Sequence, residues 1–145
     1  MKSRIVTLIT VALLILVMAL TSCGGSAIII NIDVSCDEFE QKSSNLENEF
    51  EIEIGDKIKA KLCANPTTGF KWDYVLADEN VMRFESHDYI EPDSELLGAG
   101  GVDVWVFKAI RSGKAVITME YSKPWEGGTK KERTYTMDVT VMGNR

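Results

Sequence analysis

The chain has 145 residues, with 16 lysines and arginines against 22 aspartates and glutamates, and a formal net charge of −6. This length fits one domain with a leader segment. The acidic balance argues against nucleic-acid binding, which requires a basic face. Acidity can steer basic partners toward a protein, but it identifies none of them.

The start of the chain has the features of a targeting segment. Lys2 and Arg4 form a basic beginning, and residues 5–20 are apolar apart from two threonines. Small residues then lead to Cys23 in the order Leu-Thr-Ser-Cys, which resembles the lipobox of bacterial lipoproteins. The alternative is a transmembrane anchor, but the apolar run has about 16 residues, and a bilayer core requires roughly 20.

We therefore expect residues 1–22 to be a lipoprotein signal peptide that is cleaved before Cys23. Residues 23–26 then hold the lipidated cysteine and a short linker, and residues 27–145 form the folded domain. Removal of the two positive charges of the leader changes the formal charge from −6 to −8. One acyl chain binds a membrane only marginally, and the bacterial modification that the lipobox implies supplies more than one. The expected location is the cell envelope, outside the cytoplasm, with the lipid in the outer face of a membrane.

Short β-prone segments alternate with turn residues from residue 27 onward. Residues 37–49 are polar and charged, and they predict a turn or a short helix. The alternation of polar and apolar residues predicts strands over residues 27–34, 51–54, 57–63, 70–75, 81–84, 87–90, 102–110, 115–121 and 133–141. Eight or so strands with regular turns and no long helical pattern indicate an antiparallel β-sandwich or barrel. Trp72 is expected in the core, and Phe70, Phe84, Trp105 and Phe107 in the core or on a strand face.

Cys36 and Cys63 remain once Cys23 is assigned to the lipid. Outside the cytoplasm, an even pair favours a disulfide, and two buried free thiols are the alternative. Closing a loop of about 27 residues stabilises a fold by roughly 3.5 kcal/mol when the effect is treated as chain entropy. Such a bridge would also brace the base of the loop that begins two residues after Cys63.

That loop has the sequence Asn-Pro-Thr-Thr-Gly-Phe over residues 65–70. Pro66 fixes its own φ and favours an extended Asn65, and Gly69 can adopt the positive φ of a turn. Thr67 and Thr68 are β-branched and stiff. An ordinary strand connection is one interpretation. The other is a rigid, uncharged wedge that loses little entropy when a partner buries it.

The motifs of this chain resemble those of the chagasin family, which are protein inhibitors of papain-type cysteine peptidases. Residues 65–70, followed two residues later by Trp72, resemble the signature loop of the family. Residues 98–101, Gly-Ala-Gly-Gly, resemble its Gly-x-Gly-Gly loop, and residues 123–125, Lys-Pro-Trp, resemble its Arg-Pro-Trp or Arg-Pro-Phe loop. The three motifs occur in the family's order, and the resemblance spans residues 34–141. It implies that residues 27–145 form an immunoglobulin-like sandwich of about eight strands.

The resemblance also implies a function and a site. The first loop of the family enters the active-site cleft and covers the catalytic cysteine, and the other two loops contact either side, without covalent chemistry. The expected activity is reversible, competitive inhibition of a papain-family cysteine peptidase. The residues that this assigns to peptidase binding are Asn65, Pro66, Thr67, Thr68, Gly69, Phe70, Gly98, Gly100, Gly101, Lys123, Pro124 and Trp125. Lys123 departs from the family's arginine, which puts affinity or enzyme preference in question because lysine lacks the planar, bidentate donor.

Catalytic chemistry has little support in the sequence. Nucleophilic catalysis requires a thiol with a nearby imidazole and an orienting group, and no local signature links the single histidine, His87, to either cysteine. We expect a monomeric non-enzyme without cofactor, metal or nucleic-acid partner. The alternative is an immunoglobulin-like envelope lipoprotein that acts as an adhesion or assembly module through a sheet face.

Overall fold

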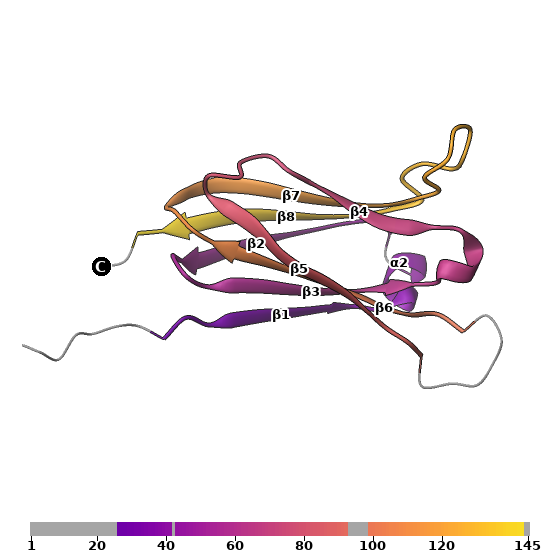
Figure 1. Cartoon of the computed structure of the whole chain (residues 1–145), viewed down its shortest axis with the longest axis horizontal. Helices are drawn as coiled ribbons and strands as arrows, with labels where there is room; N and C mark the ends of the chain where they lie inside the picture. The colour runs from indigo at the N-terminus through magenta and orange to yellow at the C-terminus, as the bar shows by residue number, and fades with distance from the viewer. Residues whose placement is uncertain (1–25, 42, 93–98, 144–145) are drawn as a thin grey trace, which may run out of the picture.

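The computed structural model describes residues 26–41, 43–92 and 99–143, which form a sandwich of two four-stranded sheets (Figure 1). Cys23 and Gly98, which were expected to carry the lipid and to contact the peptidase, lie outside the described residues. The first sheet has the order β1 (Ile29–Val34), β3 (Lys57–Ala64), β6 (Gly101–Ala109) and β5 (Met82–Ile90). The second has the order β2 (Asn45–Glu53), β8 (Arg133–Met142), β7 (Gly113–Ser122) and β4 (Lys71–Leu76).

The predicted sandwich of about eight strands is confirmed, but both sheets are mixed rather than purely antiparallel. The strand pairs β1–β3 and β2–β8 are parallel, and the other four pairs are antiparallel. In each parallel pair the earlier strand, β1 or β2, is an edge strand, and the chain passes through the opposite sheet before it reaches the partner strand. Parallel pairing needs such a crossover, because a tight hairpin can join only antiparallel strands.

The core lies between the sheets and follows the alternation of the sequence. From Ala115 on β7 and from Tyr135 on β8, every second side chain points inward, and each of these side chains is at most 5% exposed. Burial of a large aliphatic or aromatic side chain stabilises the fold by about 1.5–3 kcal/mol. Trp72, Trp105 and Phe107 are buried as predicted, whereas Phe70 and Phe84 are half-buried. The largest fully buried side chains are Tyr135, Phe107, Ile58, Leu62, Met82, Ile117, Met119, Met137 and Val139.

Two predicted boundaries were wrong, each for a local reason. Strand β2 begins at Asn45, six residues before the predicted start, because its polar first half pairs with β8 at a sheet edge where few apolar side chains are required. The two short strands predicted over residues 81–84 and 87–90 are one strand, β5. A register shift between Phe84 and Ser86 interrupts its alternation, since a bulge adds one residue without ending the strand.

Helix α2 (Cys36–Gln41) is the short helix expected within residues 37–49. Ser35 begins it with reciprocal bonds: its hydroxyl accepts the Glu38 N–H at 3.3 Å, and its own N–H donates to Glu38 Oε2 at 3.2 Å. Phe39 is buried, with its ring 5.6 Å from that of Trp72. Among the residues that the structure describes, no helix is long and apolar enough to cross a membrane.

The two ends of the sandwich differ in what they carry. Strand β1 begins and β8 ends at one end, on the left in Figure 1. The opposite end carries helix α2, the turn after β3, and the long connection between β7 and β8 (Figure 1). Residues 65–69 and 123–130, which the sequence singles out, therefore occupy the same end of the molecule.

Candidate functional site

Residues 65–69 form a compact turn that is held by its own hydrogen bonds. Asn65 caps a single 3₁₀ turn over Pro66–Thr68. The side-chain Oδ1 of Asn65 accepts the Thr67 N–H at 3.2 Å and the Thr67 hydroxyl at 2.6 Å. The carbonyl of Asn65 accepts the Thr68 N–H at 3.1 Å and the Thr68 hydroxyl at 2.6 Å. All three residues of the turn remain exposed, so the tip is both ordered and accessible.

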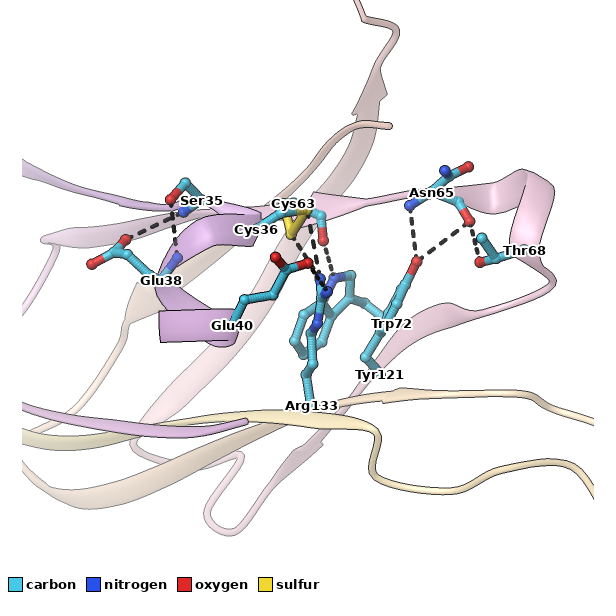
Figure 2. The surroundings of a disulfide bond; sticks show 10 residues. All are labelled: Ser35, Cys36, Glu38, Glu40, Cys63, Asn65, Thr68, Trp72, Tyr121 and Arg133. Carbon is cyan, nitrogen blue, oxygen red and sulfur yellow. Dashed lines mark hydrogen bonds and ion pairs between the residues drawn. A yellow bond between two sulfur atoms is a disulfide. The ribbon is translucent and has the colours of Figure 1, made fainter. Parts of the chain in front are cut away.

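The strand that leads into this turn is fixed from several elements, as Figure 2 shows. Cys36 and Cys63 form a disulfide, with Cα atoms 5.3 Å apart, which joins helix α2 to β3. The indole N–H of Trp72 donates to the Cys63 carbonyl at 2.9 Å. Arg133 Nη1 lies 3.0 Å from Cys63 Sγ and 3.5 Å from Cys36 Sγ, and Arg133 Nη2 lies 3.7 Å from Glu40 Oε1. The base of the turn is therefore connected to α2, β4 and β8.

The loop over residues 123–130 is closed on itself and presents an aromatic side chain. The N–H of Lys123 donates to the Thr129 carbonyl at 2.8 Å, and the N–H of Gly128 donates to the Trp125 carbonyl at 3.1 Å. The ammonium group of Lys130 donates to the Trp125 carbonyl at 3.1 Å and to the Lys123 carbonyl. Trp125 remains 50% exposed. A large apolar ring is thus displayed on a braced loop.

These two loops touch each other through Gly69. Gly69 has a φ of 81°, the left-handed conformation that glycine adopts without steric penalty. A Cβ atom at Gly69 would stand 2.6 Å from Cη2 of Trp125, so the indole packs on the bare backbone. The ammonium group of Lys123 lies 4.9 Å from the Phe70 ring centroid and 5.6 Å from that of Trp125. Such cation–π contacts contribute about 0.5–1 kcal/mol at exposed sites.

The third predicted loop meets the same turn from the other side. A Cβ atom at Gly100 would lie 3.1 Å from the Ala64 carbonyl oxygen and 3.5 Å from Asn65 Cβ. Gly100 is exposed and borders a pocket that Asn65, Thr68 and Phe70 also line. Gly101 is instead buried, and a Cβ atom there would stand 2.3 Å from the Ile90 carbonyl oxygen. Close packing against β5 therefore explains why residue 101 is a glycine, whereas Gly100 presents its backbone at the surface.

Three residues of this region were not singled out from the sequence. Tyr121 binds the backbone of Asn65, Lys130 binds two carbonyls of the 123–130 loop, and Arg133 binds the disulfide sulfurs. The alternation of β7 indicated that Tyr121 points inward. The sequence carried no signal for its hydrogen-bond partner, which lies 56 positions away.

Among the described residues, no thiol and imidazole come together at this end of the molecule. Both described cysteines are in the disulfide, and the Nε2 atom of His87 lies 2.6 Å from Asp103 Oδ1 on the adjacent strand. The His87 ring also stacks on Trp105, with ring centroids 3.9 Å apart. Within residues 26–41, 43–92 and 99–143, no group of three or more His, Cys, Asp or Glu side chains is arranged to hold a metal ion.

The chain is similar in sequence and in structure to known peptidase inhibitors. The family model described as chagasin family peptidase inhibitor I42 matches residues 51–139. Chagasin from Trypanosoma cruzi is 30% identical over an alignment of 91 residues, and the match covers 59% of this chain and 82% of chagasin. The cysteine protease inhibitor EhICP2 from Entamoeba histolytica has a similar structure, with a TM-score of 0.66, 21% identity, and coverage of 82% of this chain and all of EhICP2. PbICP-C, solved in complex with falcipain-2, has a TM-score of 0.55 and 16% identity, and the match covers 80% of this chain and all of PbICP-C.

The two solved structures share the fold of this chain, and the family match covers more than half of its length. The match includes the turn at residues 65–69 and the loop at residues 123–130. These similarities lend no support to an adhesion or assembly module. The chain belongs to the chagasin family of peptidase inhibitors, I42.

Proposed function

We propose that this chain is a reversible, competitive protein inhibitor of papain-family cysteine peptidases, and that it is not an enzyme. The observation that carries the proposal is the convergence of the three loops: Trp125 packs on Gly69, and Gly100 packs on Ala64 and Asn65. These contacts place the three loops side by side at one end of the sandwich, and we call this surface the inhibitory edge. Family membership supports the same activity.

The central turn has the properties that a wedge for a cleft requires. Residues 65–70 carry no charged side chain, so entering a cleft does not remove a charge from water. The hydroxyls of Thr67 and Thr68 already donate to Asn65 within the turn. A loop that is ordered before contact loses little conformational entropy on binding, and this saving raises affinity.

The flanking loops would contact the two sides of the cleft. Trp125 is half-exposed and supported by Gly69, and tryptophan side chains of this kind commonly dominate interface energetics. On the other side, Gly100 has no side chain to hold a partner's backbone away. Together the loops would form an interface of the standard size, about 1,600 Å² in total. The hydroxyls of the tip are engaged internally, and the two cysteines among the described residues are bound to each other, so inhibition would be non-covalent.

The location of the protein forms a second part of the proposal. We infer that residues 1–22 are a lipoprotein signal and that Cys23 carries a lipid. This rests on the lipobox-like order Leu-Thr-Ser-Cys. Because β1 begins at the end of the sandwich opposite to the three loops, a lipid three residues before Ser26 would leave the inhibitory edge facing away from the membrane (Figure 1). Metabolic labelling with a fatty acid, lost in Cys23→Ala, tests this part.

The inhibitory function is tested by titrating papain with the full chain in mild detergent and following hydrolysis of a fluorogenic peptide. Stoichiometric, competitive loss of activity is expected. Thr68→Arg should weaken inhibition strongly, because a long charged side chain would stand at the exposed tip. Ser112→Arg is the matched control, since Ser112 is exposed in the turn between β6 and β7, away from the three loops. Absence of inhibition of papain and of cathepsin-type enzymes by the folded protein would contradict the proposal.

A further inference from the structure

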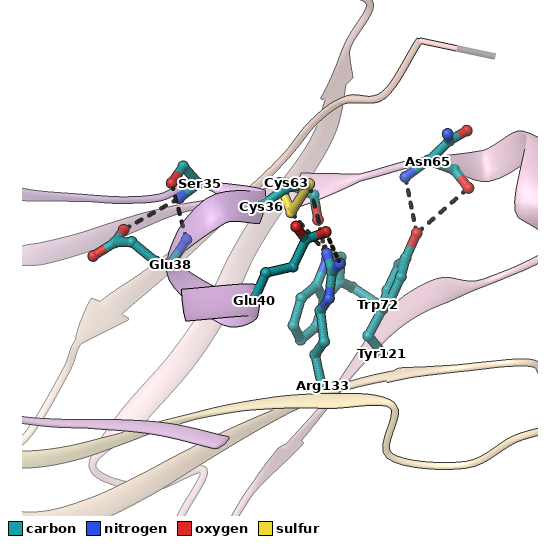
Figure 3. A network of polar contacts seen from close by, with 9 residues as sticks. All are labelled: Ser35, Cys36, Glu38, Glu40, Cys63, Asn65, Trp72, Tyr121 and Arg133. Atoms are coloured by element: carbon teal, nitrogen blue, oxygen red, sulfur yellow. Dashed lines mark hydrogen bonds and ion pairs between the residues drawn. A yellow bond between two sulfur atoms is a disulfide. The ribbon is translucent and has the colours of Figure 1, made fainter. Parts of the chain in front are cut away.

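We propose that Tyr121 is a positioning residue for the inhibitory turn; this inference rests on the proposed function. Tyr121 lies on β7, in the sheet opposite to β3, from which the turn emerges. Its hydroxyl accepts the N–H of Asn65 at 2.8 Å and lies 3.4 Å from the Asn65 carbonyl oxygen. Figure 3 shows both contacts at the first residue of the turn. The turn is therefore tied across the sandwich, and not only to its own strand.

The phenol ring is itself fixed in place. Tyr121 is 5% exposed, and its ring stacks on Phe70, with ring centroids 5.2 Å apart, and lies 5.0 Å from the Trp72 ring. The guanidinium carbon of Arg133 lies 5.8 Å from the same ring. A side chain that is packed on several sides can hold the group it binds in one orientation. The hydroxyl thus serves as a rigid anchor point.

Asn65 is the residue on which the rest of the turn depends. Its side chain binds Thr67, and its carbonyl binds the N–H and hydroxyl of Thr68. The orientation of the Asn65 main chain consequently sets the orientation of both threonines at the exposed tip. Without the Tyr121 hydroxyl, the turn would spend part of its time in other orientations. Only molecules whose turn has the native orientation can enter a cleft, so the apparent affinity falls in proportion to the fraction of molecules in that orientation.

Tyr121→Phe removes the hydroxyl and keeps the ring, and Tyr135→Phe is its matched control. Tyr135 is also buried and lies on the neighbouring strand β8, but its hydroxyl donates to Asn48 on β2 at 3.0 Å. Both variants remove the hydroxyl of one buried tyrosine, so a general loss of stability affects both. Only Tyr121→Phe releases the turn.

The test uses the full chain in mild detergent with two measurements. Hydrogen exchange followed by mass spectrometry reports on residues 65–70 in the free protein, and papain titration gives the inhibition constant. Tyr121→Phe should raise the exchange rate of this segment and the inhibition constant by about tenfold each, as expected for one lost hydrogen bond. Tyr135→Phe should leave both near the values of the unmodified protein.

Four other outcomes are decisive. Unchanged exchange in Tyr121→Phe, equal changes in both variants, or faster exchange with an unchanged inhibition constant would each overturn the positioning role. If the unmodified protein does not inhibit papain but Tyr121→Phe alone accelerates exchange of residues 65–70, the proposed function fails for papain. The role of Tyr121 in ordering the turn is then supported. Failure of one proposal is thereby distinguished from failure of the other.

Discussion

The indole ring of Trp125 lies directly on Gly69, where an added Cβ atom would stand only 2.6 Å from Cη2 of the ring. Gly69 ends the turn over Pro66–Thr68, and Trp125 is the half-exposed aromatic of the 123–130 loop. The missing side chain of one loop therefore makes room for the large side chain of the other. The relative position of the two loops depends on this contact.

Gly69→Ala should disturb both loops at once. The left-handed φ of 81° costs a residue with a Cβ about 1–2 kcal/mol, and the methyl group would also displace the indole. We expect lower thermal stability and an inhibition constant raised by at least about tenfold, which corresponds to 1.4 kcal/mol. Thermal unfolding and papain titration measure the two effects.

Gly127→Ala separates the two causes in that prediction. Gly127 has a similar φ of 73°, but nothing lies within 4 Å of the position of its Cβ. This variant should lose comparable stability and change the inhibition constant much less. If both variants weaken inhibition equally, backbone strain alone accounts for the effect, and the contact between Gly69 and Trp125 has no part in binding.

Trp125→Ala should weaken inhibition with little effect on folding. Truncation of a tryptophan at the centre of an interface commonly costs about 2 kcal/mol or more, which is roughly a 30-fold rise in the inhibition constant. The ring is 50% exposed, so the folded domain loses few core contacts. Val75→Ala is the control, because Val75 is 62% exposed on β4. A change of less than twofold in Trp125→Ala would remove this side chain from the binding surface.

Loss of the disulfide should lower the stability of the whole domain. Cys36 and Cys63 are 27 positions apart, and opening a loop of this size costs about 3.5 kcal/mol in the chain-entropy treatment. We expect dithiothreitol to lower the urea midpoint of the unmodified protein. The double variant Cys36→Ser with Cys63→Ser should start at the lower midpoint and show no response to the reductant. Equal midpoints with and without the reductant in the unmodified protein would contradict the prediction.

The buried phenol of Tyr135 should make the folded domain less stable in alkali. Burial, and to a lesser extent the charge of Glu38, raises the pKa of its phenol from 10.0 to about 12. Below about pH 10 the phenol is neutral in both the folded and the unfolded chain. As the pH rises from 10 toward 12, the unfolded chain ionises first, so the free energy of unfolding falls. Urea unfolding at about pH 9 and about pH 11 measures this loss, and Tyr135→Phe should show a smaller one.

The sequence predicted much of the fold because successive side chains of a strand point to opposite faces of its sheet, so buried and exposed residues alternate. The alternation on β7 and β8 identified their inward residues, and Trp72 was correctly assigned to the core. The errors fell where that signal is weak. The first half of β2 is a polar edge strand, and the bulge between Phe84 and Ser86 shifts the period within β5.

The candidate site was predicted as three motifs, in the order of the family, that act together on one cleft. Residues 65–70 and 123–125 were singled out by their types and order. The structure places both at one end of the sandwich, with Gly100 beside Asn65. Gly101 is the exception, because its bare backbone is used for packing against Ile90 and not for display at the surface.

The sequence by itself determined most of the strands, the composition of the loops and the family, because alternation and turn chemistry are local properties of the chain. Only the tertiary structure decided which strands pair in parallel, that Trp125 rests on Gly69, and that Tyr121 holds Asn65 from the opposite sheet. The last two contacts each join residues 56 positions apart. No local pattern encodes them, because they exist only once two sheets have packed and brought their loops to the same end.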